Sequence, residues 1–262
     1  MRVAAPLLEI RGLTKRFGGV LALDGFDLAL PEGQIRGLIG PNGAGKSTLF
    51  NLVTGALPAD AGQIRFAGLR VNGLSPHALV RLGMVRTFQK IHPFRGMTVL
   101  ESAMVGCHAR TRAGLLSAIL RLPRVADEEC RIRDAAQGAL EFVGLIARKD
   151  DAADALPLGL QRLLQLACAL ATGARLLLLD EAASGLTTAE TRRLAGLLLA
   201  VRAQGKTIVL VEHDMSLVMR ISDEITVLNF GRKLAEASPE EVRKHPEVIR
   251  AYLGGGGGGA RG

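Results

Sequence analysis

One stretch of the sequence decides the fold: Gly40-Pro41-Asn42-Gly43-Ala44-Gly45-Lys46-Ser47-Thr48. It contains the spacing Gly-x-x-x-x-Gly-Lys-Ser, follows a strand-like segment at 34–39 and precedes a helical pattern that begins near Lys46. Glycines let successive backbone N–H groups turn toward a phosphate, and the N-terminus of the next helix adds partial positive charge. We therefore predict an ATP phosphate loop, in which Lys46 contacts the β- and γ-phosphates and Ser47 ligates Mg²⁺. A tight turn without a ligand is the alternative interpretation.

A second motif places two carboxylates at the end of an apolar strand. The run 176–179 is all leucine, which is typical of a buried parallel strand, and Asp180 and Glu181 follow it directly. We expect Asp180 to hold Mg²⁺, directly or through water, and Glu181 to polarise the attacking water. A positioned base of this kind contributes roughly 10²–10⁴ in rate. Carboxylates also favour helix N-termini, so only the phosphate loop upstream makes the catalytic interpretation the better one.

Three single positions gain meaning from these two motifs. Gln89 ends the segment 85–89 and is a candidate to contact Mg²⁺ and the water, although alone it is an ordinary loop residue. His213 follows the apolar run 207–211 and is a candidate hydrogen-bond donor to a γ-phosphate, although a histidine after a strand is more often structural. Phe17 lies in an early glycine turn and is a candidate to stack on adenine, with a place in the core as its alternative role.

The composition narrows the possible classes of protein. The 262 residues carry a net charge of +8, and their three cysteines have no Cys-x-x-Cys spacing, which fits reduced thiols. No apolar run approaches the ~18 residues that span a bilayer, and we expect no signal peptide at the N-terminus. The excess of basic residues is compatible with an anionic membrane face or nucleic acid. With one tyrosine and no tryptophan to stack on bases, we do not expect nucleic-acid binding.

The remaining pattern predicts mixed helices and strands. It is helical from about 98 to 143, where Thr98 and Glu101 fit a capping box, and the charged segment from Arg121 to Arg133 with Pro123 is expected to hold a helix break. A helix is expected over 187–203.

Near the C-terminus, Ser238 and Pro239 are expected to begin a late helix. The glycine-rich residues 254–262 are expected to form a flexible tail.

The order of these motifs along the chain resembles the ABC ATPase family. The order is an aromatic residue, the phosphate loop, Gln89, a Leu-x-x-Gly segment, the acidic strand end and His213. The resemblance implies an α/β P-loop NTPase core with an antiparallel β subdomain and an inserted helical subdomain at about 90–170. It implies one ATP-binding domain over 1–253, ending in an extension at about 236–253. It also assigns adenine stacking to Phe17, the Q-loop to Gln89, the catalytic base to Glu181 and the γ-phosphate switch to His213.

Several shorter segments are similar to the ATPases of branched-chain amino acid importers. They are 16–19, 85–89, 97–99 and 246–254, together with the long insertion around 110–133. The resemblance implies a second, different ATPase subunit, two membrane permeases, a periplasmic binding protein acting indirectly and a peripheral place on the cytoplasmic face of a bacterial inner membrane. Related importers in the subfamily carry urea or short amides, so those substrates stay open.

The family signature Leu-Ser-Gly-Gly-Gln is eroded here. The aligned segment is Leu156-Pro157-Leu158-Gly159-Leu160, followed by Gln161, so that Leu156, Gly159 and Gln161 are the candidate signature residues. In the family each ATP site takes its signature from the partner chain. We therefore expect an asymmetric heterodimer with one impaired site, and a non-hydrolysing regulatory ATP-binding module stays open as the alternative.

Overall fold

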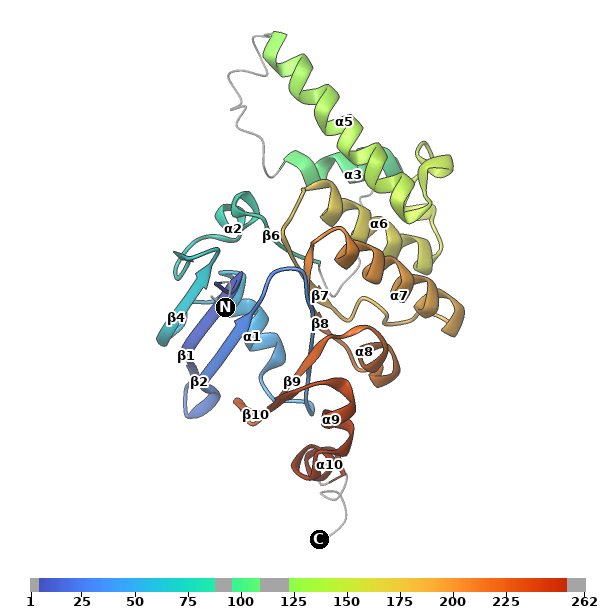
Figure 1. Cartoon of the computed structure of the whole chain (residues 1–262). Helices are drawn as coiled ribbons and strands as arrows, with labels where there is room; N and C mark the ends of the chain where they lie inside the picture. The colour runs from blue at the N-terminus through green and yellow to red at the C-terminus, as the bar shows by residue number, and fades with distance from the viewer. Residues whose placement is uncertain (1–4, 88–95, 109–122, 254–262) are drawn as a thin grey trace.

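The computed structural model describes residues 5–87, 96–108 and 123–253. Helices and strands alternate along most of this chain, and Figure 1 shows how they are arranged. In chain order they are β1 (Leu8–Phe17), β2 (Val20–Leu30), β3 (Ile35–Ile39), α1 (Lys46–Val53), β4 (Ala61–Phe66), β5 (Leu69–Arg70), α2 (Pro76–Leu82), β6 (Met84–Arg86), α3 (Val99–His108), α5 (Pro123–Val143), α6 (Leu158–Ala171), β7 (Leu176–Asp180), α7 (Thr188–Ala203), β8 (Thr207–Val211), α8 (Met215–Ile221), β9 (Glu224–Asn229), β10 (Arg232–Ala237), α9 (Pro239–Lys244) and α10 (Pro246–Leu253).

The larger of the two described sheets has the strand order β10-β9-β3-β8-β7-β6. Its strands are parallel except for β10, which pairs antiparallel with β9 at one edge. Every residue of β3, β7 and β8 is buried, because both faces of the sheet are covered. Leu177 and Leu179 pack on the side of α6, α7 and α8, whereas Leu176 and Leu178 pack on the side of α1. The strands predicted at 176–179 and 207–211 are confirmed.

The second sheet is antiparallel and has the order β2-β1-β4-β5. Leu8 pairs with Leu30 and Ile10 with Leu28, which places the apolar residues of both strands on one face. That face shares a core with α1 and the near side of the larger sheet. Together the two sheets and their helices confirm the predicted α/β fold with an antiparallel β part.

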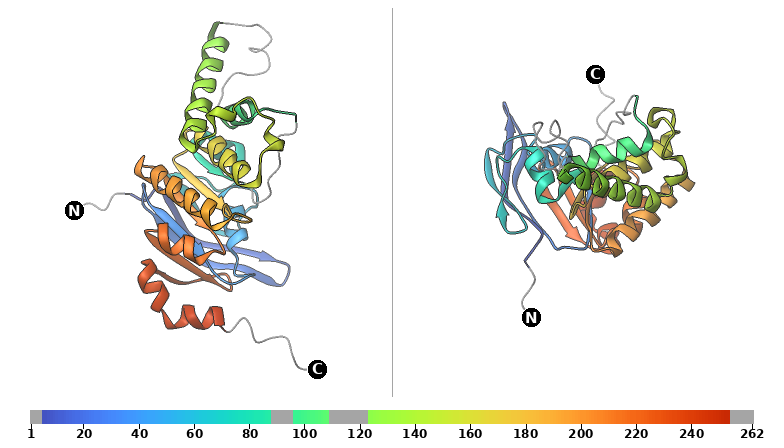
Figure 2. Two further views of the ribbon diagram at one scale, coloured as in Figure 1. Left: turned by 90° about the vertical axis from the view of Figure 1, so that its right-hand side faces the viewer. Right: turned by 90° about the horizontal axis from the view of Figure 1, so that it is seen from above.

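Helices α3, α5 and α6 lie between β6 and β7 in the chain and pack against one another. They form the upper end of the molecule in Figure 1, and Figure 2 shows α5 rising farthest from the sheets. The predicted capping box is confirmed: Thr98 N donates to Glu101 Oε2 at 2.7 Å, and Glu101 N donates to Thr98 Oγ1 at 3.2 Å. The helix break expected in the segment 121–133 does not fall after Pro123, and residues 121 and 122 lie outside the described residues, so that a break before Pro123 stays a prediction. Helix α5 begins at Pro123 and is continuous, because a first-turn proline has no N–H bond to lose.

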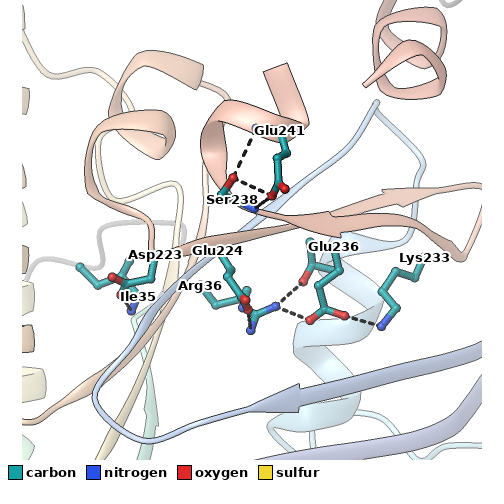
Figure 3. Close-up of polar contacts among 9 residues, drawn as sticks. Ile35, Arg36, Asp223, Glu224, Lys233, Glu236, Ser238 and Glu241 are labelled. Carbon is teal, nitrogen blue, oxygen red and sulfur yellow. Dashed lines mark hydrogen bonds and ion pairs between the residues drawn. The ribbon is translucent and has the colours of Figure 1, made fainter. Parts of the chain in front are cut away.

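The C-terminal hairpin is tied to the strand that leads into the phosphate loop (Figure 3). Arg36 of β3 is only 2% exposed, and its guanidinium makes ion pairs with Glu224 of β9 and Glu236 of β10. After the hairpin, Ser238 caps α9 through a capping box with Glu241, which confirms the predicted helix start. The Arg36 ion pairs thus add side-chain contacts to the backbone pairing that joins β3 to β9 and β9 to β10.

No helix within the described ranges has the length and apolar character that a bilayer span requires.

Candidate ATP site

The phosphate loop connects β3 to α1, as the sequence predicts. Gly45 takes a φ of +106° immediately before the helix, and a Cβ atom there would lie 2.5 Å from the carbonyl oxygen of Ala22, so only glycine fits. The side chain of Lys46 folds back over the loop and donates to the carbonyl oxygens of Gly40 at 2.6 Å and Pro41 at 3.0 Å. The loop therefore holds a buried ammonium group at the N-terminal end of a helix.

The electrostatics of Lys46 connect the loop to the acidic strand end. Burial lowers the pKa of Lys46, and the nearby carboxylates of Glu181 and Asp180 oppose that shift. The structure thus brings Lys46 close to two carboxylates that lie more than 130 positions later in the sequence. All three groups surround the loop at which the phosphates of a nucleotide would bind.

Asp180 is 3% exposed at the end of β7, and its partner is a residue that sequence reasoning missed. Arg86 of β6 donates from Nη2 to Asp180 Oδ2 at 2.6 Å and from Nη1 to Asn51 Oδ1 at 2.6 Å. The guanidinium carbon also lies 5.5 Å from the centre of the Phe50 ring. In the sequence, Arg86 is recognisable only as a charged residue in a short, otherwise apolar strand. That pattern alone does not identify the residue with which it pairs.

Glu181 and His213 meet across the ends of two neighbouring strands. The pairing of Asp180 with Val211 brings the ends of β7 and β8 together, and His213 Nε2 lies 3.1 Å from Glu181 Oε1. Glu181 has a φ of +51°, a conformation that is costly for a residue other than glycine. A strained backbone conformation of this kind persists only where the surrounding contacts hold it in place, and such residues cluster at functional sites.

A cavity of about 500 Å³ collects most of the predicted site residues. It is lined by Val20, Leu21, Ala22, Asn42, Gly43, Ala44, Gly45, Lys46, Ser47, Thr48, Glu181, Val211, His213 and Phe230. Phe17 is not among these residues. It is 46% exposed on β1, and its ring centre lies 5.6 Å from Lys15 Nζ. Gln89 lies outside the residues that the structure describes.

Glu212 is a second residue that sequence reasoning missed, although it directly precedes His213. Its side chain is 5% exposed and accepts the N–H of Ala183 at 2.8 Å, two residues after Glu181. Burial raises the pKa of Glu212 to about 7; Glu181 and Asp214 also raise it, whereas the Ala183 bond and Arg162 lower it. A buried carboxyl group thus supports the turn that carries Glu181.

Comparison with known proteins agrees with this geometry. Residues 23–184 match the family model described as ABC transporter. The chain belongs to the ABC transporter ATP-binding family. Residues 232–257 also match a model described as branched-chain amino acid ATP-binding cassette transporter.

Relatives of this ABC ATPase match it over nearly their whole length. It is 44% identical to LivG, a high-affinity branched-chain amino acid transport ATP-binding protein of Salmonella typhimurium, over 96% of this chain and 99% of the relative. It is 42% identical to BraF of Pseudomonas aeruginosa, described in the same words, with the same coverage. A solved ATP-binding cassette of an ABC transporter in its ADP conformation superposes with a TM-score of 0.83 at 31% identity, covering 95% of this chain and 98% of that one. The chain is thus an ATPase of this family.

The segment that was expected to be the family signature opens helix α6. Leu156 is buried, and Pro157 precedes the helix without a side-chain cap. Gly159 packs so closely that a Cβ atom there would lie 2.0 Å from Glu190 Oε1. Gln161 donates its side-chain Nε2 to the carbonyl oxygen of Leu156 at 2.7 Å, so this amide is engaged within its own chain. Thr187 caps α7 through a capping box with Glu190.

Proposed function

We propose that this chain powers an ABC importer of branched-chain or closely related amino acids through membrane partner subunits. The observation that carries the ATPase part is the cavity in which Lys46, Glu181 and His213 meet. The substrate class is supported by the printed functions of the relatives and by the match over residues 232–257. Import of urea or short amides by the same kind of machine is the alternative.

The residues around the cavity have separate tasks in hydrolysis. Lys46 and the loop amides hold the β- and γ-phosphates, and the Gly-rich turn brings their N–H groups close. Glu181 takes the proton of the attacking water, and His213, whose Nε2 lies 3.1 Å from Glu181 Oε1, donates to the γ-phosphate. In this scheme the base, the switch histidine and the lysine act on one phosphate group.

The donor set of the site fits Mg²⁺. The hydroxyl group of Ser47 on the first turn of α1 and the carboxylate of Asp180 are hard oxygen ligands of the kind that Mg²⁺ prefers. Arg86 bonds Oδ2 of Asp180 and thereby orients the carboxylate. We propose Ser47, Asp180 and Gln89 as the residues that hold the ion, which neutralises charge on the phosphates when bound.

We further propose that the chain works as one half of a heterodimer on the cytoplasmic face of a bacterial inner membrane. Its partners are a second ABC ATPase subunit and two permeases, with a periplasmic binding protein acting indirectly. The eroded signature supports the heterodimer, because Pro157 offers no hydroxyl group or N–H to a γ-phosphate. Each charge-assisted bond lost to phosphate costs about 1.5–3 kcal/mol, so the site that receives this signature would be the weaker one.

Uptake by the reconstituted complex tests the proposed substrate and coupling. With the binding protein, both ATPases and both permeases in vesicles, we expect ATP-dependent accumulation of leucine and none of urea. Lys46→Met should abolish accumulation, whereas Lys244→Met, at an exposed lysine of α9, should leave it unchanged. If the vesicles accumulated only urea or a short amide, the proposed amino-acid substrate would be wrong and the alternative substrate class would take its place. Unchanged uptake with Lys46→Met would favour the regulatory alternative.

A further inference from the structure

The C-terminal helix α10 borders the phosphate loop on a side that the ATP cavity does not use. It lies at the lower end of the molecule in Figure 1 and shares a second cavity, of about 340 Å³, with the loop. Pro41, Asn42 and Ala44 line this cavity from the loop, and Arg250 and Ala251 line it from α10. The segment 232–257, which matches the branched-chain family model, therefore includes an element beside the phosphate loop.

Contacts on both elements keep the loop and α10 in place relative to each other. Val248 of α10 is 5% exposed and belongs to the main hydrophobic core, which anchors the helix. In the β9–β10 turn, Gly231 donates its N–H to the carbonyl oxygen of Ala44 in the loop at 2.9 Å. A Cβ atom on Gly40 would lie 2.1 Å from the carbonyl oxygen of Leu228, so the end of β9 packs directly on the first residue of the loop.

Tyr252, the only tyrosine of the chain, brings a hydroxyl group from α10 to this first residue. Partial burial raises the pKa of Tyr252, whereas the N–H of Gly40, which faces the hydroxyl oxygen, lowers it. The carbonyl oxygen of the same glycine accepts a hydrogen bond from Lys46 Nζ at 2.6 Å. Gly40 thus has the tyrosine at its N–H group and the phosphate-binding lysine at its carbonyl group.

We propose that Tyr252 is a positioning residue of the ATP site, which holds Gly40 from the C-terminal helix and, through Gly40, the ammonium group of Lys46. The proposal rests on the ATPase function of the chain. A loop whose first residue is already held loses less freedom when a nucleotide binds, and the affinity is higher for that reason. The C-terminal extension then contributes to nucleotide affinity without touching the nucleotide.

Calorimetric titration of the full chain with ADP tests the contact. Tyr252→Phe keeps the ring and removes only the hydroxyl group. We expect its dissociation constant for ADP to rise about two- to tenfold, which is the factor that corresponds to the net contribution of one hydrogen bond. Ile249→Val is the matched control, because it trims a side chain of the same helix that is 42% exposed, against 41% for Tyr252. The control should leave ADP binding unchanged.

A Lys46→Met background separates positioning of the lysine from a general structural role. There Tyr252→Phe should cause no further loss of ADP affinity, because the tyrosine acts through the lysine and the two changes are not additive. A further loss in that background would overturn the inference, as would wild-type affinity for ADP in Tyr252→Phe alone. A wild-type chain that does not bind ADP would contradict the ATPase function itself.

Discussion

At the scale of single residues, Glu212 couples the stability of the fold to pH. Its pKa is about 7 in the folded chain and near 4.5 in the unfolded chain, so between these values the folded state binds the extra proton. Stability therefore falls as pH rises through this window, by up to about 3 kcal/mol.

Glu212→Gln should remove that dependence, since glutamine stays neutral and can still accept the Ala183 N–H. We expect the free energy of unfolding of the variant, relative to wild type, to increase from pH 4.5 to 7.5 in urea titrations. Glu129→Gln, at an exposed position of α5, is the control and should show no such trend. A constant difference for Glu212→Gln across this range would show that the pKa of Glu212 is the same in the folded and the unfolded chain.

Arg86 is the second single residue for which we predict an effect on stability, through its ion pair with Asp180. Removing it leaves the Asp180 carboxylate, 4% exposed, without its cation, and breaking a buried pair of this kind costs about 3 kcal/mol. We expect Arg86→Gln to lower the free energy of unfolding by that amount in chemical denaturation. Arg81→Gln, an exposed position of α2, should change it by less than about 0.5 kcal/mol. Equal stability of the two variants would contradict the ion pair.

The difference between predicted and missed residues has a physical cause. Lys46, Asp180 and Glu181 carry spacings or strand ends that chemistry alone explains, and the structure places Lys46 in electrostatic contact with both carboxylates. Arg86 and Glu212 act through partners far along the chain, at Asp180 and Ala183, and a pairing of that kind exists only once the sheet has formed.

At the scale of elements, the Arg36 ion pairs hold β3, β9 and β10 together. Arg36→Met should leave Glu224 without this cation and Glu236 with only its pair to Lys233, and it should lower the free energy of unfolding by about 2–3 kcal/mol. The exposed fractions of the two glutamate side chains, 44% and 26%, keep the loss below that of a fully buried pair. Urea denaturation checks the value, and Arg65→Met on an exposed position of β4 is the control. A loss no larger than that of the control would show that the network does not stabilise the sheet.

Elements with strong local signals could be predicted, and those set by tertiary contacts could not. The capping boxes at Thr98 and Ser238 and the apolar strands at 176–179 and 207–211 follow from local chemistry. Pro123 occupies the first position of α5, where a proline fits without loss of a backbone hydrogen bond, and this position follows from local chemistry as well. The hydrogen bond from Gly231 N in the β9–β10 turn to the carbonyl oxygen of Ala44 in the phosphate loop joins residues nearly 190 positions apart. No local sequence pattern predicts such a contact.

At the scale of the whole molecule, the eroded signature predicts two unequal ATP sites in the proposed heterodimer. Repair with Pro157→Ser and Leu160→Gln should raise total ATP turnover of the assembled transporter, because the partner's site then receives a hydroxyl group and a side-chain amide. Single-turnover measurements should show a second site becoming active. The pair Leu158→Ser and Gln165→Gly, on the same helix, is the control and should leave turnover unchanged or lower. Equal turnover at both sites before repair would contradict the asymmetry.

The central claim is that Glu181 is the base that hydrolyses ATP in this chain. Steady-state phosphate release by the assembled transporter tests it most directly, with Glu181→Gln compared against wild type and against Glu129→Gln. We predict that Glu181→Gln lowers turnover at this chain's site by roughly 10²–10⁴ while ATP binding is retained, and that Glu129→Gln matches wild type. Unchanged turnover in Glu181→Gln, or no turnover by either protein, would contradict the account, and the second result would favour a regulatory ATP-binding module.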